Sequence, residues 1–140
     1  MRRFLFAVVL LTSSIPAFAA PNAFSDLQAA VMQENYRAAR DIAKGLLGDK
    51  TSRADKFEVE YYLGLSHLRL GDYPEAYAVF KKLVGERPPA DVYDRAYIGL
   101  IDSFSMQGRY EEALRESEYL MNKRRDSEVL GFIYLKAARA

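Results

Sequence analysis

Residues 73–85 read YPEAYAVFKKLVG, and this stretch decides the fold because the chain contains its pattern three times. Its aromatic, small and aliphatic positions recur at intervals of 37 residues. The matching columns are Tyr36, Tyr73 and Tyr110; Ala39, Ala76 and Ala113; Leu46, Leu83 and Leu120; Leu47, Val84 and Met121; and Gly48, Gly85 and Asn122. Columns that agree in chemistry across three copies identify an internal repeat.

Each copy has the spacing of an amphipathic helix. The pattern Tyr-x-x-Ala-x6-Leu-Leu puts its apolar side chains on one stripe of a helix, and the small Ala lets a neighbouring helix approach closely. We expect Gly48, Gly85 and Asn122 to end these helices in the left-handed conformation that Gly and Asn tolerate. A first helix precedes the second and third copies, because residues 57–70 and 92–106 also carry apolar side chains at helical spacing.

Turn signals separate the two helices of a pair. Gly71 and Gly108 stand just before the second and third copies, where they are expected to end the preceding helix. Asp72 lies three residues before Glu75, as in a capping box, and Pro74 suits a first helical turn. No strand-like alternation or hairpin signal appears in the sequence. The unit is therefore helix, tight turn, helix, and the sequence predicts an all-α fold.

The N-terminus has the features of a secretory signal peptide, predicted for residues 1–19. Two arginines precede an apolar run at residues 4–11, and the small-x-small pattern at residues 17–19 predicts cleavage after Ala19. An uncleaved membrane anchor is the disfavoured alternative, because the run is much shorter than the roughly 20 residues that span a bilayer. We expect a periplasmic or secreted protein with no stable membrane insertion once the signal is removed.

Composition argues against most catalysis. The chain of 140 residues has 20 basic and 19 acidic side chains, no Cys and one His. These counts exclude disulfides, thiol nucleophiles and Cys-based zinc sites, and they leave little room for a Ser-His-Asp triad or a His-rich metal site. The one histidine, His67, occupies a packing position of the repeat. The nearly equal numbers of basic and acidic side chains do not predict a basic surface that would bind nucleic acid. We therefore expect a protein that is not an enzyme and has no catalytic residue, cofactor or metal.

The second copy resembles the tetratricopeptide repeat family. The residues at that family's spacing are Leu63-Gly64, His67 in an aromatic position, Gly71-Asp72-Tyr73, Ala76, Phe80 and Pro88. The third copy keeps Tyr97, Leu100, Phe104, Gly108, Tyr110 and Ala113. The period of 37 residues exceeds the family's 34. The resemblance implies a right-handed superhelical array of about three helix pairs plus a terminal helix.

The predicted repeat domain covers residues 20–140. Its repeats are expected at about 20–53, 57–90 and 94–127, with a terminal helix at 127–140. That last segment is apolar nearly all round, through Val129, Leu130, Phe132, Ile133, Tyr134 and Leu135. Such a helix requires burial on more than one side. Two alternatives stay open: it docks against a second copy or a partner, giving possible self-association, or the chain is the front part of a longer array.

The resemblance also implies a binding surface, because the first helices of such arrays line a concave groove. Its residues here are predicted to be Tyr61, Leu65, Arg69, Arg95, Ile98 and Asp102, extended by Phe24 and Gln28. Burial of Tyr61 and Ile98 between the helices is the alternative to exposure in the groove. The family's variant that grips a terminal carboxylate uses Asn and Lys at these places, so Leu65 and Asp102 argue against that mode.

A groove of mixed apolar and polar residues suits an amphipathic helix or an extended peptide. The sequence therefore predicts a non-enzymatic protein–protein interaction module, an adaptor, scaffold or assembly factor of the periplasm or cell envelope. Its partner is a protein or peptide rather than nucleic acid. The alternative function is a regulatory or recruiting subunit of an envelope or cell-wall enzyme.

Overall fold

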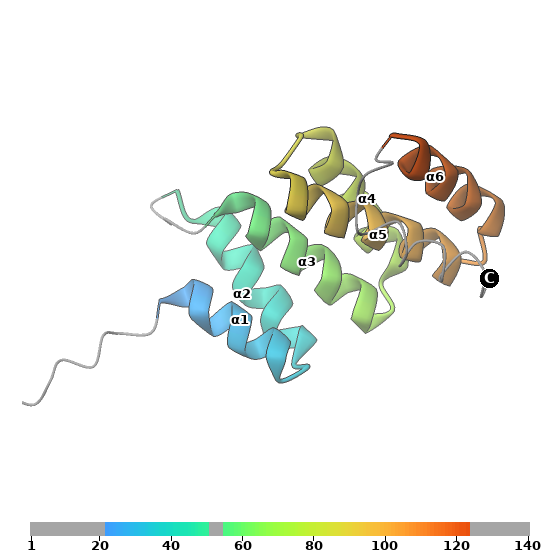
Figure 1. Ribbon diagram of the computed structural model, residues 1–140. Helices are drawn as coiled ribbons and strands as arrows, with labels where there is room; N and C mark the ends of the chain where they lie inside the picture. Colours follow the sequence, from blue (N-terminus) through green and yellow to red (C-terminus); the bar gives the residue numbers. More distant parts are fainter. Residues whose placement is uncertain (1–21, 51–54, 124–140) are drawn as a thin grey trace, which may run out of the picture.

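The computed structural model describes residues 22–50 and 55–123, and within these ranges the chain forms six α-helices and no strand (Figure 1). The helices are α1 (Ala23–Met32), α2 (Tyr36–Gly48), α3 (Lys56–Leu70), α4 (Tyr73–Gly85), α5 (Ala90–Met106) and α6 (Tyr110–Lys123). The predicted all-α fold is confirmed for this part of the chain. The signal peptide predicted at 1–19 and the terminal helix predicted at 127–140 lie outside the described residues.

The helices follow one another as three pairs, from α1–α2 at one end of Figure 1 to α5–α6 at the other. Each helix packs against the next along the chain. The first helices of the pairs also touch one another, α1 with α3 and α3 with α5. In this helical-repeat-like arrangement each helix pair packs against the neighbouring pair. As a result, α3 and α5 lie side by side.

The 37-residue period of the sequence is repeated in the backbone of the turns. One residue in each turn between paired helices has a left-handed φ: 57° at Glu34, 86° at Gly71 and 73° at Gly108. The next residue then donates its N–H to a carbonyl five residues earlier. These bonds are Asn35 to Ala30 (2.8 Å), Asp72 to His67 (2.9 Å) and Arg109 to Phe104 (3.0 Å). The prediction that Gly71 and Gly108 end the preceding helices is confirmed.

The left-handed helix ends predicted at Gly48, Gly85 and Asn122 are wrong. Gly48 and Gly85 are the last residues of α2 and α4, Asn122 lies within α6, and none of the three has a positive φ. After α4 the left-handed residue is Arg87, with φ 55°. Pro88 explains why the helix does not continue through Arg87, because a proline disfavours the right-handed helical conformation at the residue before it.

The predicted capping box between Asp72 and Glu75 is not formed. Asp72 is the N-cap residue of α4, but its side chain accepts no hydrogen bond from the backbone of that helix. Its carboxylate lies instead 3.2 Å from Nδ1 of buried His67 and 4.0 Å from the guanidinium of Arg40. Asp72 thus connects the end of α3 with α2. The prediction of Pro74 in the first turn of α4 is confirmed.

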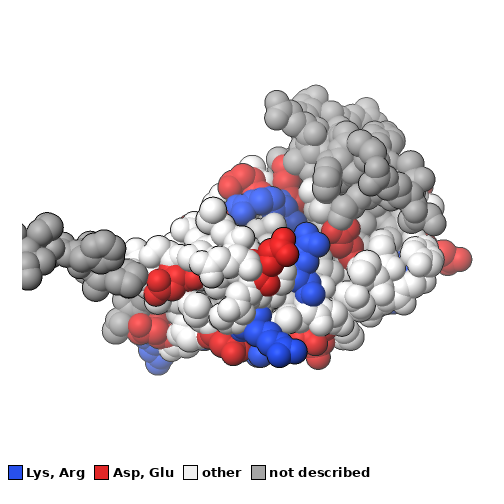
Figure 2. Space-filling model, turned by 90° about the horizontal axis from the view of Figure 1, so that it is seen from below, with Lys and Arg blue, Asp and Glu red and all other residues white. Residues whose placement is uncertain are grey.

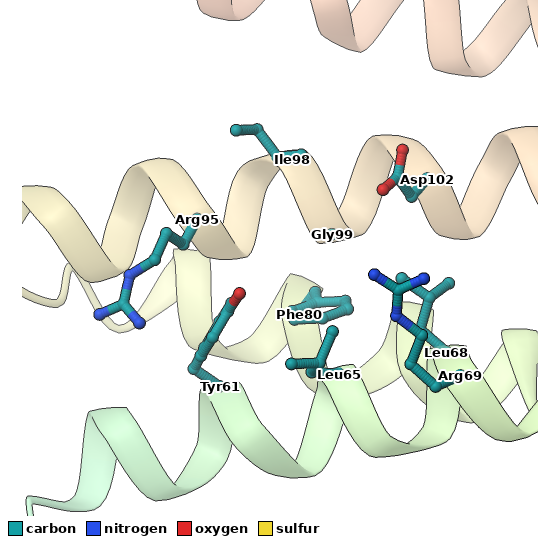
Figure 3. Close-up of a pocket in the computed structure, with 9 residues that line it drawn as sticks. All are labelled: Tyr61, Leu65, Leu68, Arg69, Phe80, Arg95, Ile98, Gly99 and Asp102. Carbon is teal, nitrogen blue, oxygen red and sulfur yellow. The ribbon is translucent and has the colours of Figure 1, made fainter. Parts of the chain in front are cut away.

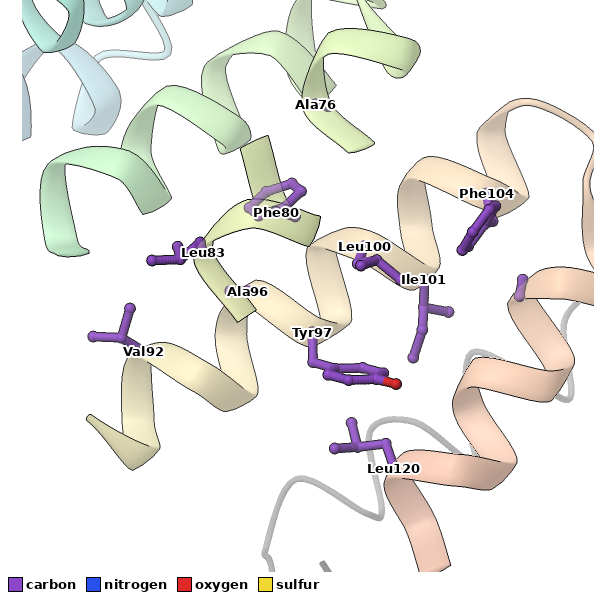
Figure 4. Close-up of a cluster of buried hydrophobic side chains, with 11 residues drawn as sticks. Ala76, Phe80, Leu83, Val92, Ala96, Tyr97, Leu100, Ile101, Phe104 and Leu120 are labelled. Atoms are coloured by element: carbon purple, nitrogen blue, oxygen red, sulfur yellow. The ribbon is translucent and has the colours of Figure 1, made fainter. Parts of the chain in front are cut away.

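The core consists of two clusters of buried side chains. The first joins α1, α2 and α3 through Leu27, Ala30, Ala39, Ala43, Val59 and Leu63. The second joins α4, α5 and α6 through Ala76, Phe80, Leu83, Val92, Ala96, Tyr97, Leu100, Ile101, Phe104, Ala113 and Leu120 (Figure 4). The repeated Ala39, Ala76 and Ala113 are all buried. The Ala column is therefore a core position in all three copies, whereas the Tyr column is not, because Tyr110 is 56% exposed.

Four charged side chains also tie α3 to α4. Lys56 Nζ donates to Glu86 at 2.9 Å, and Lys82 Nζ donates to Glu60 at 2.6 Å. Two longer contacts, of 3.7 Å between Lys56 and Glu60 and 3.4 Å between Lys82 and Glu86, complete an ion-pair square. Glu60 is buried, and the other three side chains are exposed. The ion pairs therefore link α3 and α4 at the surface and neutralise a buried carboxylate.

A phenol–carboxylate hydrogen bond and stacked rings tie α5 to α6. The hydroxyl of buried Tyr97 donates to Glu116, and its ring stacks on Tyr119 with centroids 6.2 Å apart. Burial, and after it the bond to Glu116, raises the pKa of Tyr97 far above its ordinary value. The phenol is therefore a permanent donor at neutral pH, and it fixes α6 against α5.

Candidate functional site

A hollow of about 240 Å³ opens between α3 and α5 (Figure 3). Its lining residues come from three helices: Tyr61, Leu65, Leu68 and Arg69 from α3, Phe80 from α4, and Arg95, Ile98, Gly99 and Asp102 from α5. All six of the residues that the sequence assigns to the groove line this hollow. The structure therefore brings the predicted binding residues together at one place.

Helical spacing explains why these side chains share a face. Tyr61, Leu65 and Arg69 are four residues apart on α3, so they stand one above another on the same side of the helix. Arg95 and Asp102 are two turns apart on α5, with Ile98 between them. Because α3 and α5 lie side by side, the two rows face the same hollow.

Phe80 of α4 forms the floor, and two glycines make room for it. A Cβ on Gly99 would lie 2.4 Å from Cζ of Phe80, and a Cβ on Gly64 would lie 2.7 Å from its Cε1. The fully buried ring thus rests against the backbones of α5 and α3 at once. Phe80 and Gly64 stand at repeat positions in the sequence, but repeat spacing does not predict this floor. Gly64 and Gly99 flank Phe80 only in the folded chain, so no sequence signal pointed to this arrangement.

Arg95 closes one end of the hollow, and its charge is already paired. Both of its Nη atoms donate to the carboxylate of Glu58 on α3, and Nη2 also lies 3.3 Å from Asp91. Burial by itself lowers the pKa of Arg95, but the hydrogen bond to Glu58 and the negative charges of Glu58 and Asp91 together outweigh it, so the pKa lies above the ordinary value. The guanidinium further stacks 4.5 Å from the ring centre of Tyr61. Arg95 therefore joins the two walls.

Tyr61 and Ile98 are both half-buried, so each combines the two alternatives left open by the sequence. The Tyr61 ring packs within the fold, with its centre 6.2 Å from that of Phe80, and still lines the hollow. Burial raises the pKa of Tyr61, and the charge of Arg95 opposes that shift only in part. The phenol is protonated at neutral pH, so this wall is uncharged.

Arg69 and Asp102 stand at the other end of the hollow. Figure 3 shows Arg69 rising from α3 and Asp102 standing on α5 across from it. Arg69 is exposed and Asp102 is half-buried. This end therefore presents a hydrogen-bond donor on one helix and an acceptor on the other.

Phe24 and Gln28, the predicted extension of the groove, do not line the hollow. Phe24 packs against the first core cluster, with its ring centre 6.3 Å from that of Tyr62. Gln28 is exposed on α1. The structure therefore places them apart from the six residues that it brings together.

Charges outside the hollow are mixed in sign. On the face that Figure 2 shows, Lys and Arg alternate with Asp and Glu over a mostly uncharged surface. Among residues 22–50 and 55–123, no group of three or more His, Cys, Asp or Glu side chains is placed to hold a metal ion. Within the same ranges, no helix combines the length and the apolar character needed to cross a membrane. His67 is buried and bonded to Asp72, as a packing residue would be.

Comparison with known proteins assigns no family. No family model matches the sequence, and no curated protein matches it significantly. The shape, the lining and the charges of the hollow are therefore the observations that bear on a possible ligand. Its volume is below the roughly 300–1,000 Å³ of pockets for drug-sized ligands and cofactors. A hollow of that size suits a side chain presented by a larger partner.

Proposed function

We propose that this chain is a non-enzymatic protein–protein interaction module, acting as an adaptor, scaffold or assembly factor, that binds a segment of a partner between α3 and α5. One observation carries the proposal: residues from two neighbouring helices converge on an open hollow with an apolar floor and polar ends. Concave apolar surfaces with a few placed polar groups are the usual form of binding sites. Helix grooves of this kind receive extended or helical segments.

The proposed architecture is a right-handed, tetratricopeptide-like array. The three turns that repeat every 37 residues support it, as does the contact of α3 with both α1 and α5. In such arrays each pair buries its apolar face against the next, and the stacked first helices form an extended binding surface. The hollow lies between two of these first helices.

The proposed location is the periplasm or the extracellular space. It is based on the N-terminal apolar run and the small-x-small pattern at residues 17–19. Expression of the full chain in a bacterium, followed by N-terminal sequencing of the exported protein, tests it. The expected first residue is Ala20, and retention of residues 1–19 would contradict the proposal.

Affinity capture from the envelope fraction, with the double variant Tyr61→Ala plus Ile98→Ala, tests the binding function. Both side chains line the hollow, so the variant is expected to lose the partner that the wild type retains. The matched control is Gln28→Ala plus Met32→Ala, two exposed positions on α1. Circular dichroism must show that each variant keeps its helices. Undiminished capture by the folded Tyr61→Ala plus Ile98→Ala protein would show that the hollow is not the binding site.

A further inference from the structure

We infer that the partner segment is an extended peptide that inserts one bulky, uncharged apolar side chain between Leu65 and Ile98, above the buried Phe80, and offers a backbone amide to Arg69 and Asp102. This inference rests on the proposed function and specifies the chemistry of what that site binds. Four features of the hollow lead to it: its volume, its lining, the state of Arg95, and the donor–acceptor pair at the opposite end.

The volume limits the occupant to about one large side chain. The hollow of about 240 Å³ is smaller than the pockets that enclose drug-sized ligands. It is also open between α3 and α5, so the rest of the ligand stays outside (Figure 3). A peptide meets both conditions, because its backbone runs along the opening while one side chain enters.

The lining selects an apolar side chain. The walls include the half-buried Leu65 and Ile98, and the fully buried Phe80 ring supports the floor from beneath. The Tyr61 ring adds an aromatic wall near that floor. Aromatic rings contribute most of the apolar contact area in interfaces, and they pair with other rings and with the thioether of Met. Phe, Leu and Met are therefore the expected anchors.

The charges at the Arg95 end do not call for a charged ligand. Glu58 and Asp91 already neutralise Arg95, and its flat side is covered by Tyr61. A carboxylate anchor would have to displace Glu58, and a cationic anchor would meet Arg95 at close range. Both alternatives are unfavourable in a partly desolvated site.

The Arg69 end matches a peptide bond. A guanidinium only donates hydrogen bonds, and a carboxylate only accepts them. A backbone amide offers one acceptor and one donor, so its carbonyl can bind Arg69 while its N–H binds Asp102. A carboxylate has about four acceptor positions, so Asp102 can receive this N–H beside its contacts within the protein.

A library of short capped peptides with one fixed central residue tests the inference on the full-chain protein. The fixed residue is Phe, Leu, Met, Gly, Asp or Lys, and all other positions are mixed. Fluorescence polarisation measures each pool. Because a buried apolar anchor dominates this type of interface, the Phe, Leu and Met pools are expected to bind at least about tenfold more tightly than the Gly, Asp and Lys pools. Affinity is expected to change less than about threefold between about 50 and 200 mM salt, since the binding charges are balanced.

Two variants locate the anchor. Leu65→Trp fills the hollow and is expected to weaken the best pool by at least about tenfold. Gln28→Trp is the matched control, because Gln28 occupies the equivalent position one repeat earlier, and about wild-type affinity is expected. Thermal melts establish that both variants are folded.

Backbone recognition is tested with the best peptide of the preferred pool. Methylation of the amide nitrogen next to the anchor removes its N–H and is expected to weaken binding about tenfold, as for loss of a hydrogen bond to a charged group. In an Asp102→Ala protein the same methylation is expected to have no further effect. An equal loss in both proteins would overturn the assignment of the amide to Asp102.

The remaining outcomes separate this inference from the proposed function. Tightest binding by the Asp or Lys pool, abolished by Leu65→Trp, would overturn the apolar anchor but leave the hollow as the binding site. Binding that Leu65→Trp does not change would overturn both. Self-association in sedimentation experiments, abolished by Leu65→Trp, would assign the hollow to a second copy and overturn the inference.

Discussion

Neighbouring helix pairs meet at two junctions, and three equivalent repeat positions carry large residues at one junction where they carry small residues at the other. In the first junction, where α2 packs between α1 and α3, large Leu27 and Tyr62 on the outer helices pack in one cluster with small Ala43 of α2. In the second junction, where α4 packs between α3 and α5, the equivalent residues are Gly64 and Gly99, and they face Phe80. One backbone pattern thus accepts a large residue on either side, provided that the opposite side is small.

This exchange has a consequence for the surface. In the second junction the bulk sits on α4, so the space between α3 and α5 is open above Phe80. In the first junction Tyr62 occupies the position of Gly99, and its ring packs near Phe24. The predicted groove therefore does not extend to Phe24 and Gln28. Glycine in the outer helices lets Phe80 pack between their backbones, and the hollow opens above it.

The largest expected effect comes from removing the floor of the second junction. Phe80→Ala leaves a cavity at a fully buried position and should lower the free energy of unfolding by about 3–5 kcal/mol. Urea denaturation followed by circular dichroism measures it. Leu114→Ala, at a side chain that is 51% exposed, is the control and should cost no more than about 0.5 kcal/mol. Equal effects of the two would refute the role of Phe80.

The effect of Gly99→Ala on stability is expected to change sign when Phe80 is replaced by Ala. In the wild type its Cβ would collide with Phe80 at 2.4 Å, so overpacking should destabilise the protein by about 1–3 kcal/mol. In the Phe80→Ala background the collision is gone, and the higher helix propensity of Ala should stabilise by up to about 1 kcal/mol. Urea denaturation of the four proteins completes the cycle.

Gly45→Ala in α2 supplies the control for that cycle. Nothing lies within 4 Å of a Cβ at this position, so it should stabilise by up to about 1 kcal/mol in both backgrounds. If Gly99→Ala behaved like Gly45→Ala in the wild type, the close packing of Phe80 on α5 would be wrong.

The turns of the first two pairs provide a smaller contrast. Glu34 holds a left-handed φ of 57° where the second turn has Gly71. Glu34→Gly should therefore stabilise the protein by up to about 1 kcal/mol, because relief of the strained backbone outweighs the added freedom of the unfolded chain. Gly71→Ala should destabilise by about the same amount. Thermal melts of both variants decide this, and the same sign for both would contradict the equivalence of the turns.

The smallest effect is expected from the ion-pair square between α3 and α4. The α1–α2 pair has no such square, because the positions equivalent to Glu60 and Lys82 are the uncharged Ala23 and Gly45. The hydrogen bond from Lys56 holds the pKa of Glu86 below its ordinary value of 4.5. Its contribution to stability is therefore complete above pH 4.5 and disappears as pH falls through the lower folded-state pKa. At neutral pH, Glu86→Gln should cost about 0.5 kcal/mol, since the pair is exposed to solvent.

Urea denaturation of the wild type and Glu86→Gln at a series of pH values measures that contribution. The two stability curves should converge in acid and separate near neutral pH. A difference that grew as pH fell would contradict the assigned direction of the pKa shift.

Much of this organisation follows from the sequence because it depends on local periodicity. The columns through Ala76 and Leu83 predicted the second helices and their buried faces, and the resemblance to the tetratricopeptide repeat implied the residues from Tyr61 to Arg69 that line one wall of the hollow. Where the prediction was wrong, a non-local contact or a neighbour decided the outcome. Asp72 binds His67 and Arg40 instead of capping α4, and the left-handed residue after α4 is Arg87, next to Pro88, rather than Gly85.

The floor of the hollow could not be predicted for a related reason. Gly64 and Gly99 are 35 residues apart, so they fall in different columns of the 37-residue repeat. Only the packing of α3 against α5 brings them to opposite sides of Phe80. The relation between these three residues exists in space and has no counterpart in the repeat pattern.

Site-specific photo-crosslinking compares the two junctions most directly as binding sites. A benzophenone amino acid is placed at position 65 in one protein and at position 28 in another, the same position of successive repeats. Both are expressed in the native envelope and illuminated, and mass spectrometry identifies the crosslinked peptides. The account predicts a partner peptide attached beside an apolar residue from position 65 and no such adduct from position 28. Equal adducts from both positions, or an adduct from position 28 alone, would contradict it.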